Sequence, residues 1–299
     1  MNNSLLKGSL FVALGAISYG MLTTFVKLAY AEGYTSHEIT FSQMALGLVG
    51  LVIINFFIGK NKDAAPVQNK SKSILKLMAA GTSLGLTSTF YYLAAKYIPV
   101  SIGIVLLMQS VWMGVVLEAI LDKKTPGAKK IFAVVAILAG TVLATNLMAD
   151  SFQLDWRGMG WGLLAAMSYT VTIYTSNTVS LHLHPLRRSL WMMVGGTLIV
   201  GIISFPFLIE QFDLTIFQKW GLILALFGTI LPPILYTRGM PITGVGLGAI
   251  VSSIELPAAV LMAYFLLSER VDVFQWAGIV LILIAVIQMN LRGFRQKEE

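Results

Sequence analysis

The chain has 299 residues, of which 57% are hydrophobic and only 12% are charged, and its mean hydropathy is +0.79. Soluble globular domains carry about 25% charged residues, so this composition excludes a soluble protein. The chain contains no cysteine, and its three histidines fall in polar connecting segments, so we expect no metal site and no cofactor. The net charge of +7 would suggest a nucleic-acid partner in a soluble protein, an interpretation that depends on where the charges lie.

Ten apolar runs along the chain are each about long enough to cross a bilayer as a helix, which takes roughly 20 residues. The first run follows Lys7 and shows no small-residue cleavage site, so we interpret it as a membrane span and not as a secretory signal. The sequence therefore predicts an all-α integral membrane protein with ten transmembrane helices and short loops. In chain order the predicted spans are 8–28, 39–58, 77–95, 100–121, 131–148, 158–180, 190–209, 220–237, 245–267 and 274–291.

Basic residues fall mainly on one side of these spans. Cytoplasmic loops near span ends are enriched in Lys and Arg, and placing both termini in the cytoplasm puts 16 of the 21 basic residues on that side. We therefore expect a multi-pass protein of a bacterial inner membrane, and the charge of +7 reflects topology, not a nucleic-acid partner. These 16 residues are Lys7, Lys60, Lys62, Lys70, Lys72, Lys76, Lys123, Lys124, Lys129, Lys130, Arg187, Arg188, Arg238, Arg292, Arg295 and Lys297.

The two halves of the chain repeat each other. Each half holds five predicted spans, an odd number, so the second half must enter the membrane upside down relative to the first. The sequence predicts two inverted five-helix repeats, over residues 1–149 and 150–299, an architecture that recurs in transporters with the substrate site near the midplane. The matching pairs, 150 residues apart, are Lys7 and Arg157, Gly8 and Gly158, Leu14 and Leu164, Ala16 and Ala166, Ser18 and Ser168, and Tyr19 and Tyr169.

Two further motifs lie at the end of the second repeat: Ser-Ile-Glu-Leu-Pro at 253–257 and Leu-Ser-Glu-Arg at 267–270. With the repeated openings, they make the chain resemble the EamA-type transporters of the drug/metabolite transporter superfamily over essentially its whole length. The resemblance implies a ten-helix carrier whose central cavity is lined mainly by spans 1, 3, 4, 6, 8 and 9, often an exporter of amino acids or related metabolites. The chain departs from the family pattern at Gln43, where an arginine is common, and near Trp112, where a proline is common.

Aromatic and polar side chains within these predicted spans are candidates for substrate binding. Tryptophans usually mark membrane interfaces, but Trp112 falls in the middle of span 4, and the repeat places it level with Pro257, two residues from Glu255. An aromatic face beside a carboxylate suits an ammonium or aromatic substrate, whereas the alternative role of Trp112 is packing in the core. The other candidates, in chain order, are Tyr19, Tyr92, Gln109, Tyr169 and Tyr236.

Glu255 is the most informative residue because it falls near the middle of span 9. A charged acid at that depth costs roughly 2.5–3.5 kcal/mol, which implies a partner, a wet cavity or protonation. Since burial disfavours the charged form of a carboxyl group, Glu255 is a candidate both for substrate binding and for proton coupling. The alternative is a protonated glutamate that hydrogen-bonds a neighbouring helix.

These observations predict a secondary transporter, expected as a monomer, that moves a zwitterionic or cationic small molecule across the inner membrane by alternating access. Amino acids or amines are the expected substrates, export is the expected direction, and no Lys or Arg falls at mid-depth to bind a phosphate-bearing substrate. An exporter of cationic drugs and a non-transporting membrane scaffold are the alternatives. We expect no enzyme, since the sequence shows no nucleophile motif, no intramembrane histidine and no pair of mid-depth acids.

Overall fold

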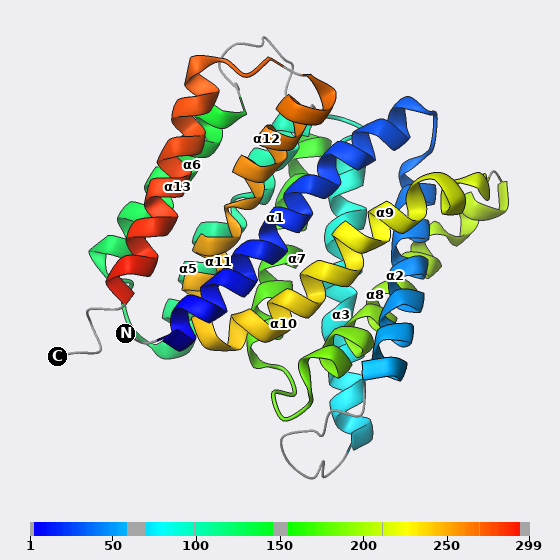
Figure 1. The fold of residues 1–299 in the computed structure, drawn as a ribbon, viewed down its shortest axis with the longest axis horizontal. Helices are drawn as coiled ribbons and strands as arrows, with labels where there is room; N and C mark the ends of the chain where they lie inside the picture. The colour runs from blue at the N-terminus through cyan, green and yellow to red at the C-terminus, as the bar shows by residue number, and fades with distance from the viewer. Residues whose placement is uncertain are drawn as a thin grey trace.

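The structure, a computed structural model, describes residues 3–58, 70–98, 100–145, 155–210, 212–268 and 270–293, and these residues form an all-α bundle (Figure 1). We call the end of the bundle where α1 begins and α13 ends the terminal face, and the other end the opposite face. In chain order the elements are α1 Asn3–Ala31, α2 Ser36–Ile58, α3 Lys70–Ala94, α4 Val100–Leu107, α5 Ser110–Asp122, α6 Ala128–Ala144, α7 Trp156–Thr178, α8 Pro185–Glu210, η1 Phe217–Gly221, α9 Leu222–Ala225, η2 Leu226–Ile230, α10 Leu231–Thr243, α11 Val245–Ser252, α12 Glu255–Leu267 and α13 Val273–Gly293, of which η1 and η2 are π-helical.

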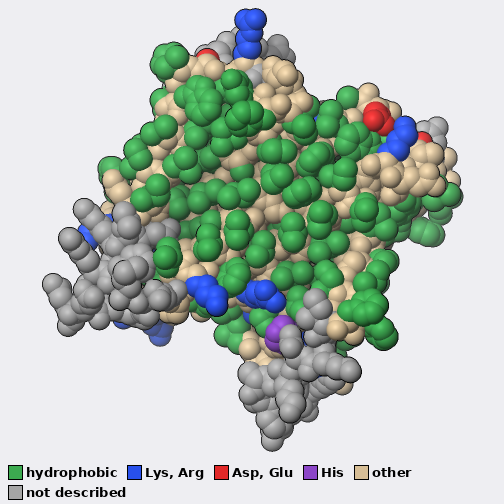
Figure 2. All heavy atoms as spheres, viewed as in Figure 1, with side chains coloured by type: hydrophobic (Ala, Val, Ile, Leu, Met, Phe, Trp, Pro, Cys, Tyr) green, Lys and Arg blue, Asp and Glu red, His purple; other side chains and the backbone are tan. Residues whose placement is uncertain are grey.

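The outside of the bundle is apolar around its middle. Figure 2 shows hydrophobic side chains covering most of the visible face, with charged side chains toward its upper and lower edges. Exposed apolar patches of this size are rare in soluble monomers and indicate contact with lipid. Six helical stretches among the described residues are long and apolar enough to cross a membrane, and Val273–Met289 is a shorter apolar helix. The six are Ser4–Ala31, Ser36–Phe57, Ile102–Asp122, Pro185–Glu210, Phe217–Thr243 and Val245–Leu267.

Two of the predicted spans contain a break that the apolar pattern does not reveal. Span 4 is divided into α4 and α5, which begins at Ser110, and span 9 is divided into α11 and α12, which begins at Glu255. Every boundary of the second pair lies 145 residues after the matching boundary of the first. Both pairs also end at a left-handed residue, Lys123 and Ser268. The break is therefore a feature of both repeats, and it places Glu255 at the start of a helix inside the bundle.

Span 8 widens into the π-helical turn η2 directly before Pro232 and Pro233. Proline has no N–H and its ring clashes with the carbonyl four residues earlier, so a regular α-helix cannot continue through this point. The hydroxyl of Thr229, in η2, donates to the carbonyl oxygen of Ala225 at 3.0 Å and lies 2.9 Å from that of Gln43. The second contact ties the widened turn to α2.

The helices that surround the centre of the bundle come from both halves of the chain. α1 packs along α10 and α12, and α3 packs against α7 and α8, whereas α6 and α13 pair with each other at one edge (Figure 1). The largest buried cluster contains Tyr169 and Tyr236 together with apolar residues of α5, α6, α11 and α13. Each half therefore contributes to one shared interior, which is where a cavity between the halves can form.

The crossing of α3 and α8 depends on glycines that leave no room for a side chain. A Cβ at Gly81 would overlap the carbonyl oxygen of Met192, and a Cβ at Gly195 would overlap that of Met78. We expect Gly81→Ala to force the two helices apart and to lower the free energy of unfolding by about 1–3 kcal/mol. Thermal unfolding in detergent measures the effect.

Gly160→Ala is the matched control for this variant, because a Cβ there meets nothing within 4 Å. An equal melting temperature for the Gly81 and Gly160 variants would show that the α3–α8 crossing tolerates a wider separation than the structure indicates.

Candidate functional site

Three tyrosines from three helices cluster beside Glu255 in the middle of the bundle. Tyr169 of α7 donates a hydrogen bond to Glu255 Oε2 at 3.2 Å, and its hydroxyl lies 2.7 Å from that of Tyr236 of α10. Tyr19 of α1 packs edge-on against both rings, with centroid distances of 6.3 Å to Tyr169 and 5.8 Å to Tyr236. The sequence named these four residues as candidates for substrate binding, and the structure brings them together.

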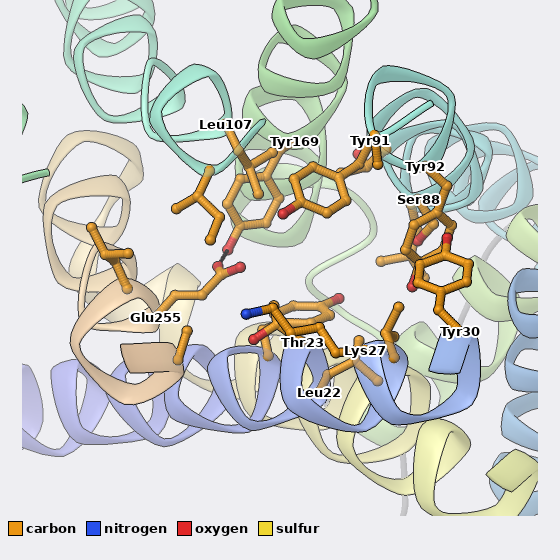
Figure 3. Close-up of a pocket in the computed structure, with 18 residues that line it drawn as sticks. Leu22, Thr23, Lys27, Tyr30, Ser88, Tyr91, Tyr92, Leu107, Tyr169 and Glu255 are labelled. Carbon is orange, nitrogen blue, oxygen red and sulfur yellow. Dashed lines mark hydrogen bonds between the residues drawn. The ribbon is translucent and has the colours of Figure 1, made fainter. Parts of the chain in front are cut away.

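A cavity of about 100 Å³ lies next to this cluster, and Glu255, Tyr169 and Tyr19 are in its wall (Figure 3). It extends from Glu255 toward the opposite face, between α1, α3, α4 and α12. Its wall is mostly apolar and aromatic, with a few hydroxyl groups, which is typical of small-molecule sites. The lining residues are Tyr19, Leu22, Thr23, Val26, Lys27, Tyr30, Leu84, Thr87, Ser88, Tyr91, Tyr92, Ala95, Ile104, Leu107, Tyr169, Glu255, Leu256 and Ala259.

A second cavity of about 750 Å³ adjoins the first one toward the opposite face. The two share Tyr30, Tyr92 and Ala95, and the wider one also reaches His37 and Lys96. The rings of Tyr30 and Tyr92 meet edge-on, with their centroids 6.4 Å apart, where the two cavities join. The predicted residue Tyr92 therefore lies at the passage between a wide vestibule and the narrow cavity that contains Glu255.

Two residues in the wall of the narrow cavity had no assigned role in the sequence analysis. Tyr91 has a buried hydroxyl that no described residue hydrogen-bonds, and Lys27 extends from the distal part of α1 into the same cavity as Glu255 (Figure 3). Lys27 lies one residue before the end of the predicted first span, 8–28. The signal that could have found it is the spacing of Tyr19, Thr23 and Lys27, which puts all three on one face of α1.

Trp112 and Gln109 lie outside the wall of the cavity next to Glu255. The indole Nε1 of Trp112 donates to Gln109 Oε1 at 2.9 Å, and Gln109 Nε2 donates to the carbonyl oxygen of Val105 at 3.0 Å. The Trp112 side chain is 39% exposed, and neither residue is in the wall of the cavity next to Glu255. The structure thus brings together the four tyrosines and Glu255 but not Trp112 and Gln109, whose role in binding stays a prediction.

On the side toward the terminal face, a buried arginine ties helices together. Arg188 of α8 is 2% exposed, and its guanidinium donates to the carbonyl oxygens of Ser176 at 2.6 Å, Thr237 at 2.8 Å and Val179 at 3.0 Å. One side chain therefore joins the end of α7 and the middle of α10 to α8. The sequence counted Arg188 among residues that set topology and did not predict this role.

Acidic and basic groups in the described residues do not gather into a metal site: no group of three His, Asp or Glu side chains lies close enough to hold an ion. Glu118 of α5 forms an ion pair with Lys130 and accepts a hydrogen bond from the backbone N–H of Gly246 at 3.3 Å. Glu118 thereby links the two broken helix pairs near the terminal face. The carboxylate that faces the cavity is that of Glu255.

Comparison with known proteins agrees with this architecture. A model of the EamA-like transporter family matches the chain twice, over residues 6–146 and 156–291. An uncharacterized inner membrane transporter, YicL of Salmonella typhimurium (strain LT2), is 24% identical over 299 residues, with 97% of each chain covered. A solved crystal structure shares the fold with a TM-score of 0.75 at 14% identity, over 93% of this chain and 95% of the other. Because the family model covers nearly the whole length in two copies, the chain belongs to the EamA-like transporter family.

Proposed function

We propose that this membrane transporter moves small zwitterionic or cationic metabolites, such as amino acids or amines, and that Glu255 binds their ammonium group. The observation that carries the proposal is the Glu255 carboxylate in the wall of a cavity lined by tyrosines. A carboxylate in a largely apolar cavity attracts a cation more strongly than it would in water. The ring faces of Tyr19 and Tyr91 add sites for an ammonium or aromatic group.

Glu255 also offers a means of coupling substrate transport to proton movement. Its carboxyl group can hold a proton or contact a substrate ammonium, but one occupant weakens the binding of the other. If it exchanges the two between conformations that open to different sides, substrate leaves while a proton enters. Tyr169 supports both forms, because its hydroxyl can donate to the carboxylate or accept from the protonated acid.

The membrane arrangement that we propose has ten spans in two inverted repeats, with both termini in the cytoplasm of a bacterium. The distribution of Lys and Arg supports this orientation, and the similar Salmonella protein is named as an inner membrane transporter. In this orientation the narrow cavity and the adjoining vestibule open to the outside, and the packing around Arg188 closes the cytoplasmic side.

Purified protein in proteoliposomes is expected to exchange radiolabelled amino acids or amines across the membrane in counterflow assays. The panel covers apolar, aromatic and basic amino acids and their amines, with and without an imposed proton gradient. Substrate movement that responds to the gradient supports both binding and coupling by Glu255. If well-folded protein moves no member of the panel, the scaffold alternative stands.

The alternative of a cationic drug exporter is distinguished in the same vesicles. The apolar and aromatic wall of the cavity is the feature that would suit lipophilic cations. If tetraphenylphosphonium competes with the radiolabelled substrate better than any amino acid or amine does, the result favours an exporter of cationic drugs. Weak or absent competition supports the metabolite transporter.

A further inference from the structure

The narrow cavity has one acidic and one basic residue in its wall. Glu255 and Lys27 are the charged members among the residues that line it, and they come from different halves of the chain. We propose that Lys27 binds the carboxylate of the substrate while Glu255 binds its ammonium group, so that the transporter selects zwitterions over simple amines. This inference rests on the proposed function and narrows its substrate class.

The geometry of α1 directs Lys27 toward Glu255. Gly20 lies against the backbone carbonyl of Glu255, with no room for a side chain between them. Lys27 follows seven residues later, which is about two helical turns, so it lies on the same face of α1. Side chains on a helix tilt toward its N-terminus. The lysine therefore leads back along α1, and Figure 3 shows its nitrogen directed toward the part of the cavity where Glu255 lies.

Hydroxyl groups also line this cavity. Thr23 lies between Gly20 and Lys27 on α1, and Ser88 and Tyr91 face the cavity from α3 (Figure 3). The Tyr91 hydroxyl is buried without a hydrogen-bond partner among the described residues. A buried hydroxyl in this condition costs free energy unless a ligand or water pairs with it. A bound substrate with a carboxylate and an ammonium group supplies both an acceptor and a donor at this place.

The two charges make the cavity selective by repulsion as well as by attraction. A simple amine is attracted by Glu255 but repelled by Lys27, and a simple carboxylate meets the reverse. A zwitterion placed with its ammonium group toward Glu255 is attracted at both ends. Because the wall is mostly apolar, each of these attractions and repulsions is stronger than in bulk water. The repulsion discriminates against a substrate that carries a single charge.

The test compares amino acids with the amines that lack only the carboxylate. The pairs are phenylalanine and phenethylamine, leucine and 3-methylbutylamine, and arginine and agmatine, each titrated calorimetrically into the protein in lipid nanodiscs. For at least one pair the wild type is expected to bind the amino acid more tightly. Lys27→Met should weaken the binding of that amino acid roughly tenfold or more, because a charged hydrogen bond is lost. The matching amine should bind equally well or better, because the repulsion by Lys27 is removed.

Two further variants control the experiment. Lys27→Arg keeps the charge and is expected to keep the preference for the amino acid, which separates charge from packing if Lys27→Met folds poorly. Lys96→Met removes a charge from the adjoining vestibule and is expected to leave the preference unchanged.

The outcomes separate this inference from the proposed function. A wild type that binds or transports amines better than amino acids, or a Lys27→Met variant that weakens both members of a pair equally, overturns the role of Lys27 and leaves a transporter of amines or amino acids standing. If neither member of any pair is bound or transported by the wild type, the proposed function itself fails.

Discussion

Replacing Glu255 with glutamine is expected to abolish most transport without unfolding the protein. The two side chains have nearly the same shape, and glutamine can still accept the hydrogen bond from Tyr169. The variant removes the acidic group from the cavity wall, and losing a charged hydrogen bond of about 1.5–3 kcal/mol weakens substrate binding roughly 10- to 100-fold. Response to an imposed proton gradient should disappear as well, because the amide does not titrate. Counterflow and gradient-driven uptake in proteoliposomes measure both effects.

Glu210→Gln is the matched control, because it makes the same chemical change at the edge of the adjoining vestibule. We expect this variant to transport at the wild-type rate. A Glu255→Gln protein that keeps its melting temperature, its rate and its response to the gradient would remove Glu255 from the mechanism.

Replacing Arg188 with alanine is expected to cause the largest loss of stability among single substitutions near the terminal face. Three backbone carbonyls on α7, the segment after it and α10 lose their donor, and each buried group left unpaired costs about 1–3 kcal/mol unless water replaces the guanidinium. Thermal unfolding in detergent, with yield in the membrane as a second measure, reports the effect.

Arg188→Lys should recover only part of that stability, because an ammonium cannot reproduce the planar fork that reaches the three oxygens. Arg157→Ala, at an exposed position at the start of α7, controls for the loss of an arginine from a helix and should change the melting temperature little. If Arg188→Ala has the same melting temperature as Arg157→Ala, water or a neighbouring donor pairs with the carbonyls. Arg188 then does not hold the helices together.

The apolar pattern predicted the positions of the helices well, because bilayer thickness and the absence of charge fix where a span starts and ends. It did not predict the breaks before Ser110 and Glu255. In span 9, Pro257 is compatible with the break because proline is tolerated in the first turn of α12. Span 4 breaks at the same place without a proline, so the break comes from how the helices of each repeat pack and not from a local residue.

The sequence pointed to a residue of the candidate site where one residue type was unexpected at its depth, as with Glu255, which lies in the cavity wall. Trp112 attracted attention for the same reason, but the structure places it half-exposed on α5 and outside the cavity wall. Depth along a helix can be counted from sequence, whereas the face that a residue presents depends on which helices surround it. Lys27 shows the opposite case: its backbone lies near a span end, but its long side chain reaches the cavity.

The different origin of the two cavity charges has a consequence for how such a protein can arise. In a symmetric dimer of one five-helix unit, any acid that faced the central cavity would face it twice, and so would any base. One acid and one base in the wall of a single cavity require the two units to differ. Joining them in a single chain lets the first keep Lys27 and the second Glu255, so that the wall of one cavity carries one charge of each sign.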